Sequence, residues 1–83
     1  PGKTISRAEF LKLAIEAGEF PLDEVLTAPY SDTPLGEWFT PYFDFAKRKN
    51  IFETGSDTIA SPSRSITRAE AADVIYNLLL LQR

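Results

Sequence analysis

Apolar positions near both ends of the chain recur at the three- and four-residue spacing of an α-helix. In the first stretch the stripe consists of Phe10, Leu11, Ala14 and Ile15. It predicts a helix from Arg7 to about Ala17, ended by Gly18 in the left-handed conformation. The last stretch predicts a helix from Arg68 to about Leu81. Its apolar set covers well over a third of the circumference, so this helix is expected to need two neighbours.

Aromatic residues predict a third helix between these two. The spaced residues are Trp38, Tyr42, Phe45 and Ala46. Pro34 or Gly36 is expected to open the helix, and Pro41 must lie in its first turn or mark a bend, because its missing N–H is harmless only there. The basic residues 47–49 suit the C-terminal end of the helix dipole, so we interpret them as a helix-end device. Asn50 is expected to end the helix in the left-handed conformation.

The connecting segments are rich in turn-forming residues. Residues 19–27 contain enough apolar residues for one short turn of helix. Residues 51–59 supply at most a very short extended pair around a glycine-containing turn. The predicted fold is therefore all-α, a small bundle of about three main helices with long ordered loops.

A five-residue motif occurs twice. Ile-Ser-Arg-Ala-Glu at residues 5–9 returns as Ile-Thr-Arg-Ala-Glu at residues 66–70, an offset of 61 residues. Each copy lies at the head of a predicted helix, which indicates an internal repeat rather than chance.

The motif has the chemistry of a helix start. Ser6 and Thr67 are predicted N-caps, and Glu9 and Glu70 stand where they can bond back to the cap N–H, which is a capping box. The carboxylates also suit the positive end of the helix dipole.

Capping does not explain the motif arginines, Arg7 and Arg68. A cation at the first helical position is mildly unfavourable against the dipole. One interpretation is a solvated charge that pairs with a nearby carboxylate.

Composition narrows the classes of function. Hydrophobic residues make up 43% and charged residues 25%, and the net charge is -3. This is typical of a folded globular domain and disfavours a nucleic-acid binder or a polybasic membrane-surface element. Cysteine and histidine are absent, which removes disulfides, the usual metal ligands, thiol nucleophiles and the usual general base. The longest apolar run, residues 78–81, is too short for a membrane span. We therefore expect no enzyme activity, metal or cofactor.

Further residues stand in a fixed order before the second motif. They are Tyr30 and Asp32 with one residue between them, Trp38, Asn50-Ile51, Gly55 and Pro62. With the repeated motif, this order resembles the S-layer homology (SLH) domain, whose repeats end in an Ile-Thr-Arg-Ala-Glu-type motif. By this resemblance residues 28–83 are a complete repeat, residues 1–18 are the C-terminal helix of a preceding repeat, and residues 19–27 are a linker.

The resemblance implies both an architecture and a function. SLH repeats pack as a pseudo-threefold prism. They hold secreted surface proteins on the bacterial cell wall by non-covalent binding to anionic, often pyruvylated, polysaccharide. The residues implied to bind that polysaccharide are Arg68, Arg7, Trp38, Asp32, Glu70 and Gly55. The arginines would contact the anion, the tryptophan would offer a flat face to a sugar ring, and the acidic residues would orient the arginines or accept sugar hydroxyls.

Structural roles compete with these implied roles. Trp38 is also a natural core residue, Asp32 can cap the turn before the aromatic helix, and Glu9 and Glu70 are capping residues first. The alternative function is a protein-interaction or self-assembly module that uses apolar helix faces without a sugar site. The wide apolar face of residues 74–81 predicts a further copy, supplied by self-association, as in a trimer, or by other SLH repeats in cis.

Overall fold

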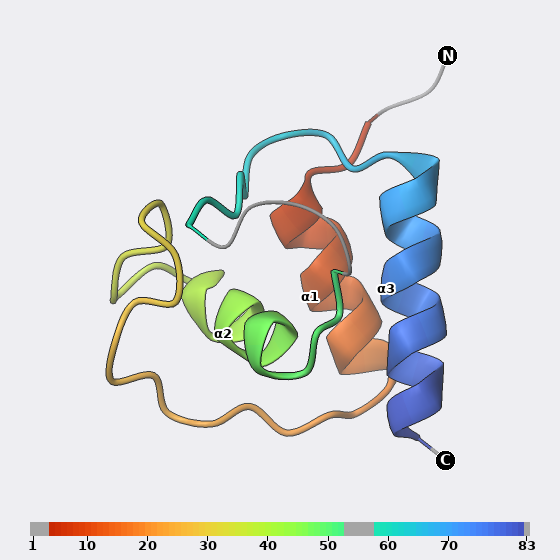
Figure 1. The fold of residues 1–83 in the computed structure, drawn as a ribbon, viewed down its shortest axis with the longest axis horizontal. Coiled ribbons are helices and arrows are strands. Elements are labelled where there is room, and N and C mark those ends of the chain that lie inside the picture. The colour runs from red at the N-terminus through yellow and green to blue at the C-terminus, as the bar shows by residue number, and fades with distance from the viewer. Residues whose placement is uncertain (1–3, 53–57, 83) are drawn as a thin grey trace.

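The computed structural model describes residues 4–52 and 58–82 (Figure 1). Within them the backbone forms three α-helices, α1 (Arg7–Ala17), α2 (Thr40–Arg48) and α3 (Arg68–Leu81), and a single isolated β-bridge between Ser6 and Ser65. The prediction of an all-α fold is confirmed, with both terminal helices at the expected bounds. None of the described helices is long and apolar enough to cross a membrane.

The first helix is the centre of the packing. It contacts both α2 and α3. Figure 1 shows α1 and α3 side by side, with their N-termini at the same end of the molecule. The two helices that begin with the repeated motif are therefore direct neighbours, as consecutive members of an internal repeat can be.

Side chains from all three helices form one buried cluster. Its fully buried members include Leu11 and Ile15 of α1, Phe43 of α2, Ile51 just after α2, and Val74 of α3. Burying side chains of this size contributes about 1.5–3 kcal/mol each.

Both capping boxes are present as predicted. Ser6 Oγ accepts from the Glu9 N–H, and Glu9 Oε1 accepts from the Ser6 N–H, each at 3.1 Å. At the second motif Thr67 Oγ1 accepts from the Glu70 N–H at 3.1 Å, and Glu70 Oε1 accepts from the Thr67 N–H at 3.0 Å. The matching bonds explain why α1 and α3 begin at equivalent residues.

The start of the aromatic helix was predicted wrongly. The helix begins at Thr40 rather than at Pro34 or Gly36, so Trp38 lies in the turn before it. Gly36 has φ 98°, which breaks any helix that begins earlier. Pro41 lies in the first turn and Asn50 follows the helix with φ 54°, both as predicted.

Two expectations about the chain after α1 were also wrong. Gly18 has φ -84°, and the left-handed residue is Glu19, with φ 58°. Glycine is needed at position 18 for space, because a Cβ there would lie 2.4 Å from the Phe20 ring. Residues 19–27 contain no helix: Leu22 and Leu26 are exposed and have no core to pack against. The extended pair expected at residues 51–59 involves residues 53–57, which lie outside the described residues.

We predict that Leu11→Ala lowers the free energy of unfolding by about 2–4 kcal/mol, because it opens a cavity at a fully buried position. The matched control is Leu26→Ala, since Leu26 is 78% exposed and should change stability by less than about 0.5 kcal/mol. Urea unfolding followed by circular dichroism measures both. Equal losses would contradict the assignment of Leu11 to the core.

Candidate functional site

The segment before the second motif folds back onto the N-terminus of α1. Arg64 O accepts from the Arg7 N–H at 2.8 Å, and Pro62 O accepts from the Ala8 N–H at 3.0 Å. The Ile66 N–H donates to Ile5 O at 2.9 Å, so the two motifs are joined at their leading isoleucines. These bonds satisfy N–H groups that the first turn of α1 leaves without partners in the helix.

The Arg7 side chain is buried within this contact, with the residue only 8% exposed. Its Nε donates to Ala60 O and its Nη1 donates to Glu70 Oε2, each at 2.8 Å. The guanidinium carbon lies 4.1 Å from the centroid of the Phe52 ring. Burial lowers the pKa of Arg7, and the Glu70 charge opposes that change, so the guanidinium stays protonated. We call Arg7 with Ala60, Glu70 and Phe52 the arginine clamp.

Glu70 uses both carboxylate oxygens. Oε1 closes the capping box at Thr67, and Oε2 accepts from Arg7 and from Arg64. Desolvation is the largest influence on the pKa of Glu70 and raises it, but the hydrogen bonds from the Thr67 backbone and Arg64, with the charges of Arg7 and Arg64, lower it overall. Sequence reasoning missed Arg64, because nothing in the motif spacing distinguishes it from other loop cations.

Asp32 binds the backbone of Ala60, one of the residues of the arginine clamp. Its two carboxylate oxygens accept from the Ala60 and Ser61 N–H groups, each at 2.8 Å. Ser61 has φ 54°, so the carboxylate fixes a strained turn. Asp32 therefore caps this turn rather than the one before the aromatic helix. Since Ala60 O accepts from Arg7, a continuous chain of hydrogen bonds runs from Asp32 through Ala60 and Arg7 to Glu70.

Two other residues implied by the resemblance are exposed. The Arg68 guanidinium has no ion pair or hydrogen bond with any described residue. Trp38 is 50% exposed and packs edge-on against Phe39 and Tyr42. It also forms a wall of a groove whose other lining residues are Thr4, Ile5, Glu9, Lys12 and Leu13. Gly55 lies outside the described residues.

The geometry thus brings together Arg7, Asp32 and Glu70 and leaves Arg68 and Trp38 at the surface. In the described part of the chain, no group of three or more histidine, cysteine, aspartate or glutamate side chains is placed to hold a metal ion. The arrangement joins two equivalent helix starts through a buried arginine.

Comparison with family models identifies the class of protein. The S-layer homology domain matches residues 29–72, more than half of the 83-residue chain. The chain therefore belongs to the SLH family, whose members are binding modules of the cell wall, typically in cell-surface proteins. No curated protein and no solved structure matches the chain.

We predict that Glu70→Gln lowers the free energy of unfolding by about 1–3 kcal/mol. Glutamine keeps the capping box but removes the negative partner of a buried guanidinium. Glu9→Gln is the matched control, because Glu9 holds the equivalent capping position without an arginine partner in the described structure and should change stability much less. Equal losses in urea unfolding would show that the clamp adds nothing to the cap.

The clamp also predicts a dependence on pH. The pKa of Glu70 is lower in the folded protein than its ordinary value of 4.5. Its ionised form therefore stabilises the fold above that value, and this contribution is lost as the pH falls through the folded-state pKa. The stability difference between wild type and Glu70→Gln should be full at neutral pH and shrink below about pH 4.5. Urea unfolding at a series of pH values measures it, and a difference that stays constant into acid would contradict the pairing.

Proposed function

We propose that this chain anchors a secreted surface protein to the bacterial cell wall by non-covalent binding of an anionic, pyruvylated polysaccharide. Membership of the SLH family supports cell-wall binding in general. The choice of an anionic polymer is supported by the different environments of the two motif arginines.

The contrast between Arg7 and Arg68 carries the proposal. Arg7 binds a carboxylate, that of Glu70, at 2.8 Å. Arg68 occupies the same position after the same kind of cap, but it is exposed and no described residue neutralises it. A guanidinium offers a planar pair of donors that fits a carboxylate, and a pyruvyl ketal carries one. The N-terminus of α3 beside Arg68 favours an anion as well.

Trp38 supplies the second contact in the proposed site. An exposed indole face can pack against the C–H face of a sugar ring. Ile5 and Leu13 extend the apolar wall of its groove, and Lys12 and Glu9 add a cation and a carboxylate that suit charged or hydroxylated sugars. Lys12 was not among the residues implied by the resemblance.

The remaining implied residues take a positioning role in this proposal. Arg7, Asp32 and Glu70 already satisfy one another through Ala60. They hold the loop before α3 against α1 and thereby set where the second motif, and Arg68 within it, begins. Their substitution should weaken polymer binding through loss of the fold rather than through loss of a contact.

The experiment is cosedimentation with purified cell-wall sacculi, before and after acid removal of the secondary polysaccharide. Wild type should pellet with intact sacculi and not with stripped ones. Arg68→Ala should weaken binding about 10- to 100-fold, since it removes a charge-assisted hydrogen-bonding side chain. Arg48→Ala is the matched control, because Arg48 is an exposed arginine of α2 that pairs with Asp23 and Asp44.

Three results would count against the proposal. Pelleting that survives stripping would identify peptidoglycan as the ligand. An equal loss of sacculus binding in Arg68→Ala and Arg48→Ala would show that only the net charge of the protein matters. Failure of the wild type to pellet would show that this chain does not bind the cell wall.

A further inference from the structure

The internal repeat allows α1 and α3 to be compared position by position. With the offset of 61 residues, Arg7 corresponds to Arg68 and Glu9 to Glu70. Each helix then has two equivalent faces. The arginine face of α1 consists of Arg7, Ala8, Leu11 and Ile15, and its counterpart on α3 consists of Arg68, Ala69, Ala72 and Tyr76. The glutamate face of α3 consists of Glu70, Val74 and Leu78, and its counterpart on α1 consists of Glu9, Leu13 and Ala17.

Burial divides these faces in a complementary way. The arginine face is buried on α1 and exposed on α3, where Tyr76 is 59% exposed. The glutamate face is covered on α3, with Val74 and Leu78 in the core, and exposed on α1, where Leu13 is 56% exposed. Each helix therefore uses one face and leaves the other uncovered.

The two covered faces meet each other. Arg7 of one pairs with Glu70 of the other, and their apolar residues belong to the same buried cluster. The two uncovered faces carry the corresponding pair of charges, a cation on α3 and a carboxylate on α1. Arg68 has no partner in the described structure, and Glu9 bonds only within its own capping box. One chain thus presents a counterpart of each half of the contact that it makes internally, with Ala72 and Tyr76 in place of Leu11 and Ile15.

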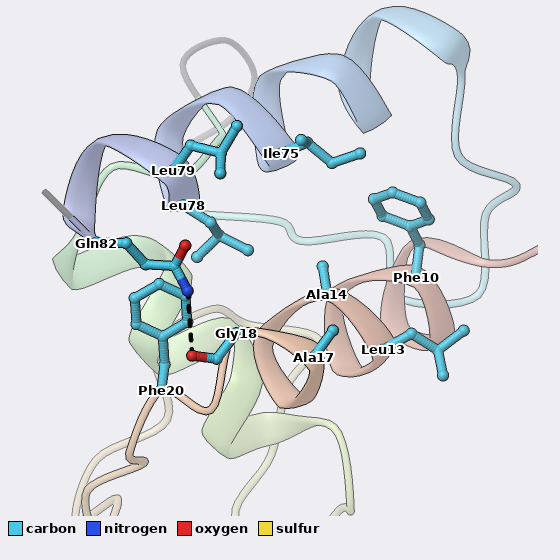
Figure 2. Close-up of a pocket in the computed structure, with 10 residues that line it drawn as sticks. All are labelled: Phe10, Leu13, Ala14, Ala17, Gly18, Phe20, Ile75, Leu78, Leu79 and Gln82. Atoms are coloured by element: carbon cyan, nitrogen blue, oxygen red, sulfur yellow. Dashed lines mark hydrogen bonds between the residues drawn. The ribbon is translucent and has the colours of Figure 1, made fainter.

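An apolar groove borders the uncovered glutamate face. It lies between α1 and α3 and has a volume of about 410 Å³. Figure 2 shows Leu13 and Ala17 of α1 on one side and Ile75 and Leu79 of α3 on the other. The bond from Gln82 Nε2 to Gly18 O, 3.3 Å long, lies at the end of the groove near the C-terminus of α1. Exposed apolar surface of this kind favours an occupant that brings its own apolar helix face.

We propose that the occupant is a second copy of this chain, bound head to tail. The arginine face of α3 in one copy packs on the glutamate face of α1 in the other, and Arg68 of the first pairs with Glu9 of the second. The contact joins two different surfaces, so each copy keeps one free half and association can continue beyond a dimer. This contact needs no polysaccharide, so it goes beyond the proposed function.

Sedimentation equilibrium over a range of protein concentrations, without cell-wall material, tests this contact. The average mass of wild type should rise above the 9.3 kDa of one chain as concentration increases. Arg68→Glu should weaken association at least about tenfold, because it places like charges opposite each other. Leu13→Asp should have the same effect, and it changes an exposed side chain, so the fold is retained. Arg48→Glu is the control for a change of net charge and should associate like wild type.

A charge swap tests the pairing directly. Arg68→Glu and Glu9→Lys should each associate poorly alone, because each variant places like charges opposite each other. Their equimolar mixture should recover association, because both kinds of contact between unlike copies bring opposite charges together. Circular dichroism verifies that Glu9→Lys, which alters a cap, keeps its helices; if it does not, Glu9→Gln removes the charge with the cap intact and should weaken association.

Either of two results would overturn the inference. One is a wild type that stays at the mass of a single chain at every concentration. The other is association that Arg68→Glu and Leu13→Asp leave unchanged. Because no wall material is present, neither result bears on the pelleting experiment.

Discussion

The burial of the Arg7 guanidinium is the constraint on which the rest of the structure depends. A buried cation is tolerated only when its donors are bound and its charge is balanced. Ala60 O and the Glu70 carboxylate accept hydrogen bonds from the guanidinium, Glu70 balances its charge, and the Phe52 ring packs against it. These partners come from different parts of the chain, so satisfying one side chain fixes the loop before α3 and the start of α3 relative to α1. Asp32 extends the same constraint to the segment before α2.

The features that were predicted correctly from the sequence are those with local causes. The starts of α1 and α3 follow from capping boxes whose members lie three residues apart. The start of α2 was predicted too early, because the aromatic spacing continues back to Trp38 while Gly36 adopts a positive φ. Gly18 was assigned to a left-handed turn, but its role depends on the approach of the Phe20 ring. The spacing of residue types along the chain does not predict that contact.

The candidate site also shows the difference between features with local causes and features that depend on long-range contacts. The interpretation of a motif arginine as a solvated charge that pairs with a nearby carboxylate is only partly correct for Arg7. Arg7 pairs with a carboxylate, but it is buried, and the carboxylate belongs to the other motif. Two nearly identical five-residue motifs have opposite environments: Arg7 is buried and Arg68 is exposed. Within the motif the two copies differ only by Ser6 against Thr67, and in both the arginine follows a capping box at the first helical position. The difference arises from which chain segment lies against each helix start. Arg64, which joins the same carboxylate, has no signal in the sequence for the same reason.

The motif is therefore best understood as a way of presenting a guanidinium rather than as a binding site by itself. A capping box fixes the first helical turn, and the arginine at its first position is held where a carboxylate can approach it. At Arg7 the carboxylate is that of Glu70 in the second motif, and the result is a structural clamp. At Arg68 the described chain brings none, so the same chemistry faces outward. A ketal carboxylate of a polysaccharide and a glutamate of a second copy are alike to such a guanidinium. What separates them is the surroundings: a sugar ring needs the exposed face of an aromatic residue, whereas a helix needs a matching apolar face. This chain presents an exposed aromatic residue at Trp38 and an exposed apolar face along α1, and for that reason we propose two kinds of recognition for one arginine.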